Sequence, residues 1–443
     1  MFDFGGANTE QIRAIKCVDG PVRVISGPGT GKTFTVVRRV AYLIQELNVL
    51  PKKIMIVTFT DKAARELITR ISMFFSEKGI SANISEMYIG TFHSICLRLL
   101  KEYDKSNTRY RIIDSFEQQY LIYRNFNRFR QIDNFEFVFE GESTWEKSKS
   151  IAEASNRIIE ELIDPQKLQY SKNVEFSVIG KVIEEYFRLL EKENEYDFSL
   201  ILFELYRLLK GKEDVLSQIQ NQFEYIIVDE YLDTNRIQER LILLIGENHN
   251  NICVVGDEDQ SLYRFRGARA TNIINFPKHF GGKCETIVLE KNYRSRKSIV
   301  DFYNRWMKNT LEFEWGNSRY DKQIESSDSN STDIECVYQI NENGDKEEYN
   351  RLYHLICDLK NRGLVSDYNQ IVFLFKSVKS RKTREFYKYL ESHEIHVNSP
   401  RSELFFERDE IKLLIGVLLS LFPKYSEKLE DDTFKISRSF KKY

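Results

Sequence analysis

The residues with the clearest chemical signature run from Ser26 to Thr33 and read Ser-Gly-Pro-Gly-Thr-Gly-Lys-Thr. Glycines at this density let successive backbone N–H groups turn toward one anion, and a helix that starts here adds its dipole. Lys32 is placed to reach the β- and γ-phosphates of a nucleotide, and the Thr33 hydroxyl to hold Mg²⁺. The rest of the nucleotide-binding loop is Gly27, Pro28, Gly29, Thr30 and Gly31. The pattern predicts a phosphate-binding loop (P-loop) for ATP, although Ser26 stands where the strict pattern has Gly. A Gly-rich turn without a ligand is the alternative.

Two further apolar runs end in residues that suit phosphate chemistry. Ile226 to Val228 leads into Asp229 and Glu230, which could bind Mg²⁺ and polarise an attacking water, respectively. Val254 and Val255 lead into a polar turn in which Gln260 could sense the γ-phosphate. Each feature alone is also common on protein surfaces. Their combination with the P-loop predicts that Lys32, Asp229, Glu230 and Gln260 act at one catalytic site.

The elements that must position these residues have the pattern of an α/β protein. Short β-branched runs predict strands at residues 22–25, 53–57, 86–89, 225–228, 252–255 and 286–289. Helices are expected after the first two strands, from about Lys32 and over 63–71. Each strand ends in polar residues, as expected where a sheet carries a site at the carboxyl ends of its strands.

The middle and the end of the chain differ in character from this part. Residues 91–210 have helical spacing and predict a helical insertion, whereas the Ser/Asn/Asp-rich residues 316–333 predict a surface loop. Beyond the loop, strands are expected at 334–339, 371–375 and 396–398, and helices at 347–361, 382–393 and 407–422. Aromatic and basic residues alternate between Tyr120 and Phe139, which is typical of the core of a helical subdomain and compatible with a nucleic-acid surface.

Composition limits the class of protein. The 443 residues are 42% hydrophobic and 30% charged with a net charge of −2, as in a globular protein with sizeable cores. The six cysteines form no CxxC pair, so we expect reduced thiols rather than a zinc site or disulfides. We find no signal peptide and no apolar stretch long enough to span a bilayer. We therefore expect a cytoplasmic protein without a membrane partner.

The motifs also stand in the order and wording of a known family. The chain resembles the UvrD/Rep family of superfamily 1 DNA helicases from about Asn8 to Phe422. The resemblance rests on Asn8–Gln11, Thr58–Glu66, Gly90–Ser94, Asp229–Thr234, Gly256–Ala268 and Leu289–Ser295, in addition to the P-loop. It departs from the family at Asp61, where Asn is usual, and at Leu232, where Gln is usual.

The resemblance implies roles for further residues. Gln11 and Tyr293 would hold adenine, Thr33 and Asp229 would hold Mg²⁺, and Arg294 would reach the γ-phosphate. A single DNA strand would be contacted by Phe59, Thr60, Thr91, His93, Tyr263, Phe265 and Arg266. Without the resemblance, the pattern around Tyr263 and Phe265 is more typical of an ordinary half-buried strand end. ATP would then lie between two lobes whose closure accompanies its turnover.

The resemblance also implies a domain layout. The fold class is α/β: a P-loop NTPase with a RecA-like lobe and a helical insertion, plus an incomplete second RecA-like lobe. We expect the first ATP-binding lobe at 1–90 and 211–285, the insertion at 91–210, the partial second lobe at 286–422, and a tail or truncated second insertion at 423–443. The family's last motifs, of the kind His-x-Ala-K-G-L-E and Tyr-Val-Ala-x-T-R-A, are not found in residues 296–443.

Two functions remain open at this point. The first is an ATP-dependent helicase or translocase on single-stranded DNA, moving 3′ to 5′ by resemblance. The second is an ATP-gated single-strand-binding module that needs a second chain to supply the missing motifs. A P-loop kinase or GTPase is disfavoured because the guanine-reading Asn-Lys-x-Asp is not found.

Overall fold

The structure is a computed structural model, and it describes residues 2–104, 110–139, 143–260, 271–311, 320, 322–327, 336–339, 344–398 and 409–421. The chain divides into two compact units, Met1–Cys336 and Val337–Tyr443. Each unit is described by itself below.

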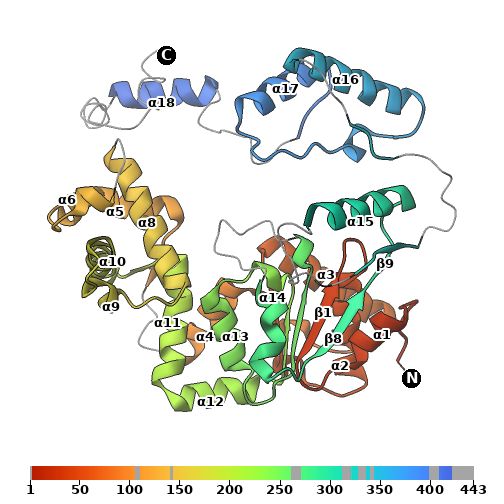
Figure 1. Ribbon diagram of the computed structural model, residues 1–443, viewed down its shortest axis with the longest axis horizontal. Helices are drawn as coiled ribbons and strands as arrows, with labels where there is room; N and C mark the ends of the chain where they lie inside the picture. The colour runs from red at the N-terminus through yellow and green to blue at the C-terminus, as the bar shows by residue number, and fades with distance from the viewer. Residues whose placement is uncertain are drawn as a thin grey trace. The chain divides into compact units, whose positions relative to one another are not determined.

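A parallel sheet of six strands organises the first unit (Figure 1). Its order is β3-β2-β6-β7-β1-β8, and every described pairing in it is parallel. The strands are β1 (Val22–Ser26), β2 (Ile54–Thr58), β3 (Tyr88–Thr91), β6 (Tyr225–Val228), β7 (Ile252–Gly256) and β8 (Glu285–Leu289). The α/β class predicted from the sequence is confirmed, and all six predicted strands form within two residues of their expected bounds.

Both faces of this sheet are buried, as is usual for parallel strands that are covered by helices. Alternate residues of the strands face two different cores. One core contains α1 (Thr9–Lys16), α2 (Lys32–Gln45) and α3 (Asp61–Lys78). The other contains α4 (Phe92–Tyr103) and α13 (Arg236–Ile245) and continues into the helices that precede β6. This two-sided burial holds the carboxyl ends of the strands in register with one another.

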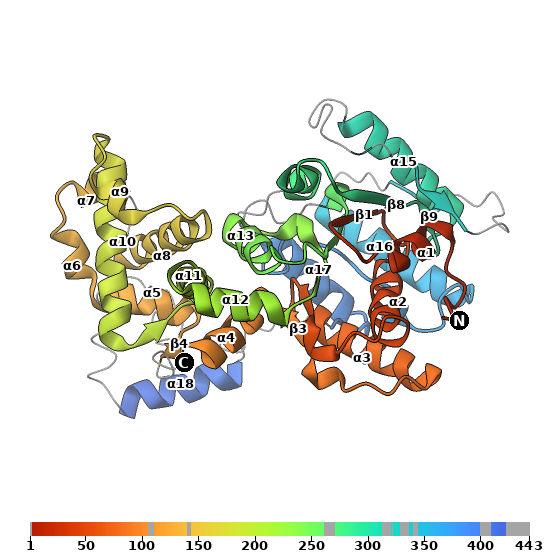
Figure 2. The same cartoon turned by 90° about the horizontal axis from the view of Figure 1, so that it is seen from below.

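Between β3 and β6 the chain is mainly helical, and Figure 2 shows these helices gathered to one side of the sheet. They are α5 (Ser115–Arg124), α6 (Phe126–Arg130), α7 (Phe135–Val138), α8 (Thr144–Glu160), α9 (Pro165–Gln169), α10 (Val174–Glu193), α11 (Phe198–Gly211) and α12 (Glu213–Gln222), with the short ladder of β4 (Arg111–Ile112) and β5 (Glu195–Tyr196). Phe126, Phe129, Phe135 and Phe139 are buried here. The core interpretation of the aromatic run is therefore confirmed for these four residues.

After β7 and in addition to β8, the first unit contains four further elements, the last of which lies beside the P-loop. They are α14 (Thr271–Asn275), β9 (Lys291–Asn292), α15 (Lys297–Leu311) and β10 (Glu325–Ser326). Among the described residues of this unit, 3-10 turns form at η1 (Pro51–Lys53), η2 (Ile84–Glu86), η4 (Tyr231–Asp233), η5 (Glu258–Gln260) and η7 (Phe276–Phe280). β8 contains the residues at which we predicted the second lobe to begin, and it pairs with β1 at the edge of the first sheet.

The second unit is built on α16 (Asp345–Asn361), η9 (Tyr368–Gln370), α17 (Arg381–Glu391) and α18 (Asp409–Leu421). Its core is formed by Tyr349, Ile356, Phe386, Leu390 and Ile395. The three helices agree with the prediction. The strands expected at 371–375 and 396–398 are not formed, because a strand needs a hydrogen-bonded neighbour and the described residues of this unit supply none. The predicted division into lobes stays a prediction.

Candidate active site

The P-loop joins the end of β1 to the start of α2. Thr30 holds the turn closed, since its hydroxyl lies 2.7 Å from the Ser26 hydroxyl and donates to the Gly27 carbonyl at 2.8 Å. Gly29 and Gly31 have φ values of 72° and 89°, in the left-handed region that L side chains rarely adopt. Gly31 directly precedes Lys32, the first residue of α2. The loop therefore turns its backbone onto a helix N-terminus, where phosphate is favoured.

Lys32 and the acidic pair meet beside this loop. The Lys32 ammonium donates to Glu230 Oε1 at 2.6 Å, although 198 residues separate them. Asp229 comes from the end of β6, and burial together with the neighbouring Glu230 charge raises its pKa to about 6, against the lowering effect of Lys32. Glu230 has a φ of 52°, which is uncommon for a residue with a side chain and is typical of functional turns. The structure thus brings together three of the predicted catalytic residues.

Gln260 lies in the turn after β7, the strand next to β1 in the sheet. Its side-chain Nε2 donates to Asp257 Oδ2 at 2.5 Å, and its backbone N–H donates to the Asp257 carbonyl at 2.8 Å. Beneath the turn, Leu232 is fully buried and would contact a Cβ placed on Gly256. Leu232 therefore packs as a core residue under the turn that carries Gln260.

The segment after β8 runs along the outside of the P-loop. The Tyr293 N–H donates to the Gly29 carbonyl at 2.9 Å, while the Tyr293 ring is 47% exposed. Arg294 is exposed, and its Cβ lies 2.9 Å from the position that a Cβ on Gly29 would take. Both residues predicted to contact nucleotide from this segment are therefore next to the loop.

Asn292 ties this segment to the loop, and the sequence reasoning assigned it no role. Its side chain is buried, donates to the Pro28 carbonyl at 2.6 Å, and accepts from the N–H groups of Arg294 and Ser295 at 2.8 and 2.7 Å. Its place inside the Leu289–Ser295 motif was the signal that could have identified it. One buried amide thus fixes both the loop and the residues that follow β9.

Gln11 reaches the loop from the other side. It caps α1 together with Asn8, and its Nε2 donates to the Thr30 carbonyl at 3.0 Å. The same nitrogen lies 2.7 Å from the position of a Cβ on Gly31, so that a side chain at Gly31 would collide with it. This placement beside the P-loop agrees with the predicted contact to the nucleotide, which itself stays a prediction.

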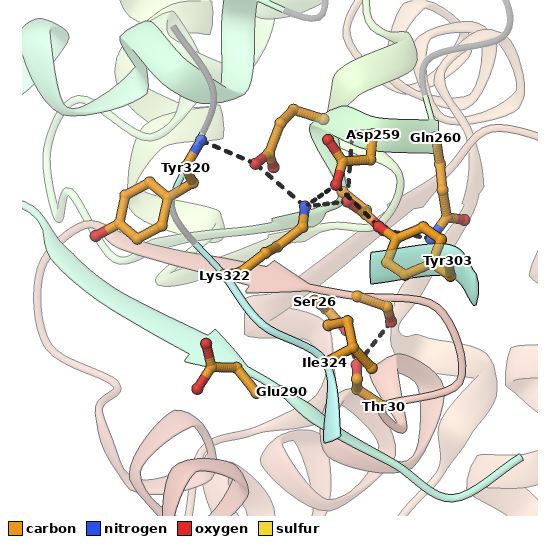
Figure 3. Close-up of polar contacts among 12 residues, drawn as sticks. Ser26, Thr30, Asp259, Gln260, Glu290, Tyr303, Tyr320, Lys322 and Ile324 are labelled. Carbon is orange, nitrogen blue, oxygen red and sulfur yellow. Dashed lines mark hydrogen bonds and ion pairs between the residues drawn. The ribbon is translucent and has the colours of Figure 1, made fainter. Parts of the chain in front are cut away.

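Residues 322–327 also belong to the site, and the prediction of a surface loop is wrong for Lys322 and Ile324, which are buried. The predicted loop residues 316–319, 321 and 328–333 lie outside the described residues. β10 pairs with β9, and Ile324 is buried against Gly27 (Figure 3). Lys322 has a fully buried side chain that forms ion pairs with Asp257, Glu258 and Asp259. Burial lowers the pKa of Lys322, but the three facing carboxylates outweigh it and raise the pKa above its ordinary value. The residues around Lys322 and Ile324 are mostly polar, so the sequence pattern does not indicate that these two side chains are buried.

The residues predicted to contact DNA divide into two groups. Phe59, Thr60, Thr91 and His93 follow β2 and β3, which are neighbours in the sheet with Thr58 opposite Thr91. Thr60 and Thr91 are the N-caps of α3 and α4, and their hydroxyls accept from Ala63 N and Ser94 N. His93 packs edge-on to Phe198 at 5.6 Å, and burial lowers its pKa. Tyr263, Phe265 and Arg266 lie outside the described residues.

The site suits ATP with Mg²⁺ on its donor set. The loop offers a backbone turn whose glycines leave no room for a Cβ beside Ile324, Asn292 and Gln11. Next to it lie an ammonium, a threonine hydroxyl in the first turn of α2, and two carboxylates. Oxygen ligands in small number, completed by phosphate and water, are what Mg²⁺ prefers. A separate cavity of about 340 Å³ lies in the second unit, lined by residues such as Phe373, Phe386 and Val397. None of the predicted site residues that the structure describes lines this cavity.

None of the helices described is long and apolar enough to cross a membrane. The six cysteines are free, and no group of three or more His, Cys, Asp or Glu among the described residues could hold a metal ion by itself.

Comparison with known proteins covers both units. The UvrD/REP helicase N-terminal domain matches residues 7–281, and the UvrD-like helicase C-terminal domain matches residues 287–429. The C-terminal match thus includes most of the part for which we expected an incomplete second lobe.

Curated relatives agree with these matches. The chain is 31% identical over 417 residues to the ATP-dependent DNA helicase PcrA of Bacillus subtilis (strain 168), covering 93% of this chain and 53% of that protein. It is 34% identical over 342 residues to a probable DNA helicase II homologue of Mycoplasma capricolum, covering 75% of this chain and 45% of that protein. The chain therefore spans about half the length of the relatives it matches. Taken with the geometry of the P-loop site, these matches show that the chain belongs to the UvrD/REP helicase family.

Proposed function

We propose that this chain binds ATP with Mg²⁺ and hydrolyses it as the nucleotide motor of a DNA helicase that acts on single-stranded DNA. The observation that carries the proposal is the pairing of Lys32 with Glu230 at 2.6 Å, next to Asp229 and at the mouth of the P-loop. This is a phosphate-binding cation, a metal-binding acid and a general base in one place. Family membership supports the same activity.

The proposal assigns roles to the residues, and their positions around the P-loop and the family resemblance support these roles. Backbone N–H groups of the loop and Lys32 bind the β- and γ-phosphates, while Gln11 and Tyr293 hold the base. When bound, Mg²⁺ would be held by Thr33 and Asp229 and would neutralise charge on the phosphate oxygens. Gln260 and Arg294 contact the γ-phosphate.

The Lys32–Glu230 pair suggests how the base is released. The γ-phosphate and the Glu230 carboxylate are both anions, so a bound γ-phosphate competes with Glu230 for the ion pair with Lys32. Glu230 is then free to accept a proton from a water molecule. The water oxygen bonds to the γ-phosphorus, the bond between that phosphorus and the bridging oxygen breaks, and ADP and phosphate leave.

Part of the proposed DNA contact set lies at the ends of β2 and β3. Phe59 and Thr60 follow β2, which pairs directly with β6, the strand that Asp229 follows. Tyr263, Phe265 and Arg266 follow Gln260 by a few residues along the chain. Aromatic rings and donors of this kind suit single-stranded DNA, with bases stacked on the rings and phosphates on the donors. Movement from 3′ to 5′ is part of this proposal and comes from the family resemblance.

The test is ATP hydrolysis by the purified chain with and without a single-stranded oligonucleotide. Lys32→Ala should abolish turnover, whereas Lys149→Ala, at a lysine 65% exposed on α8, should leave it unchanged. Stimulation by the oligonucleotide would support the DNA contacts, and unwinding of 3′-tailed but not 5′-tailed duplexes would support the direction. Wild-type turnover no higher than that of Lys32→Ala would refute the proposed function.

A further inference from the structure

Lys322 is a buried cation that the nucleotide chemistry above does not use. Its side chain has no exposed surface, and it lies on the segment 322–327, which returns to the P-loop after α15. An ammonium group has three N–H donors, and here it faces three carboxylates: Asp257, Glu258 at 3.1 Å and Asp259 at 3.2 Å. Figure 3 shows Lys322 directed at this turn, with Gln260 at its end. One side chain therefore reaches all three acids of the turn.

Each acid is also fixed by a second contact. Glu258 Oε1 accepts from the Tyr320 N–H at 3.1 Å, and Asp259 Oδ2 accepts from the Tyr303 hydroxyl of α15 at 2.8 Å. Asp257 uses its other oxygen, Oδ2, for the Gln260 amide. The turn is thus held between the sheet on one side and Tyr303, Tyr320 and Lys322 on the other.

The contact between Asp257 and Gln260 determines which way the Gln260 amide faces. An ionised carboxylate only accepts hydrogen bonds, so the Gln260 nitrogen must be the atom that faces Asp257. The second Nε2 hydrogen and the Oε1 oxygen are left for other partners. Lys322 acts on Gln260 through this contact, because it holds the opposite oxygen of the same carboxylate.

Without Lys322, the turn would have buried acids with little compensation. Glu258 Oε2 is buried and finds no hydrogen-bond partner among the described residues. Buried carboxylates that lose their counter-ion repel one another and are expelled toward water or take up protons. Either response would displace residues 257–259 and would rotate the Gln260 amide away from its present direction.

We propose that Lys322 is a positioning residue of the nucleotide site, whose ammonium group holds the Asp257–Asp259 turn in the conformation that directs Gln260 toward the γ-phosphate. The proposal rests on the proposed ATP hydrolysis for its kinetic consequence. Its conformational consequence, an ordered turn, does not depend on that function. The two can therefore be tested separately.

The experiment compares Lys322→Met with Lys297→Met, which removes an exposed lysine of α15 paired with Asp301. Hydrogen exchange read by mass spectrometry follows the peptides that cover 252–260 and 22–26. Binding of a fluorescent ATP analogue and steady-state ATP turnover are measured on the same preparations. A third variant combines Lys322→Met with Glu258→Gln. It removes one carboxylate together with the ammonium group, and the new glutamine amide can donate to the carboxylates of Asp257 and Asp259.

We expect Lys322→Met to speed exchange of the 257–260 amides by about tenfold or more, with β1 exchange unchanged. We expect kcat to fall by about tenfold or more while the Kd of the ATP analogue changes by less than about threefold, which marks an effect on turnover rather than on binding. The double variant should recover part of both losses, and Lys297→Met should behave as wild type.

Wild-type exchange at 257–260 in Lys322→Met would overturn the proposal, as would an unchanged kcat in an active protein. If Lys322→Met does not fold, the double variant is compared with Glu258→Gln alone by exchange at 257–260 and by kcat. Equal values in these two variants would overturn the proposal. If the wild-type chain hydrolyses no ATP, the proposed function fails, and the exchange at 257–260 still decides whether Lys322 orders the turn.

Discussion

Asn292→Asp is the substitution that separates the two tasks of the buried amide beside the P-loop. The aspartate keeps an oxygen to accept from the N–H groups of Arg294 and Ser295, as Asn292 Oδ1 does at 2.8 and 2.7 Å. It loses the donor to the Pro28 carbonyl at 2.6 Å and places a carboxylate against that carbonyl. The change therefore weakens the attachment of the segment to the loop, of which the hydrogen bond from the Tyr293 N–H to the Gly29 carbonyl remains, without unfolding the turn that carries Arg294.

The magnitude follows from what is lost at a buried position. One missing hydrogen bond that leaves a buried acceptor without its donor costs about 1–3 kcal/mol in unfolding free energy. Asn292→Ala loses all three hydrogen bonds at about 0.5–1.5 kcal/mol each, or about 1.5–4.5 kcal/mol together. Both variants should weaken ATP binding, because Tyr293 and Arg294 no longer have a fixed position beside the loop.

The assay is urea unfolding followed by circular dichroism, together with titration of a fluorescent ATP analogue. Asn248→Asp is the matched control, since it makes the same chemical change at an exposed position. An Asn292→Asp protein as stable as the control, with unchanged affinity for the analogue, would refute the reasoning that this amide ties the two segments together.

Three further predictions concern the same unit. Gly27→Ala should weaken binding of the ATP analogue, because the new methyl group overlaps Ile324 and overpacking costs about 1–3 kcal/mol; adding Ile324→Ala should restore binding, and no restoration would contradict the assigned contact. Glu230→Gln should lower kcat by about 10²–10⁴-fold with ATP affinity retained, as measured by turnover and analogue titration, because it removes the proposed base; substantial turnover in this variant would exclude that role. Burial raises the pKa of Glu160 from 4.5 to about 7, so the ionised form of this carboxyl disfavours the folded state. The free energy of unfolding should therefore decrease as the pH rises from 4.5 through about 7. The melting temperature of Glu160→Gln should therefore fall less than that of the wild type between pH 5 and 8, and parallel curves would contradict this.

The sequence predicted those parts of the structure that depend on local pattern. β-branched runs located the six strands of the sheet, and the glycine spacing of the P-loop located the helix that starts at Lys32. The meeting of Lys32 with Glu230 was also predictable, because parallel strands bring their carboxyl ends to one edge of a sheet.

The parts that the sequence did not predict depend on contacts between distant residues. Lys322 and Ile324 lie in a stretch of Ser, Asn and Asp that has the composition of a loop, and only the acids after β7 and the bare backbone of Gly27 make their burial favourable. The strands expected at 371–375 and 396–398 failed for the opposite reason. Their β-branched residues have the right local pattern, but pairing in a sheet requires a neighbour that composition cannot supply.

The buried ion pair between Lys322 and Asp257 has a consequence for how the protein is made. The two residues are 65 positions apart, so at about 5–20 residues per second a ribosome needs roughly 3–13 s to add the lysine after the acid. During that time the sheet strands up to β7 are already synthesised, and the acids must stay hydrated because their counter-ion does not yet exist. The nucleotide site should therefore be the last part of this unit to mature, and a ribosome-bound chain that stops before Lys322 should hold a formed sheet with an open acidic turn.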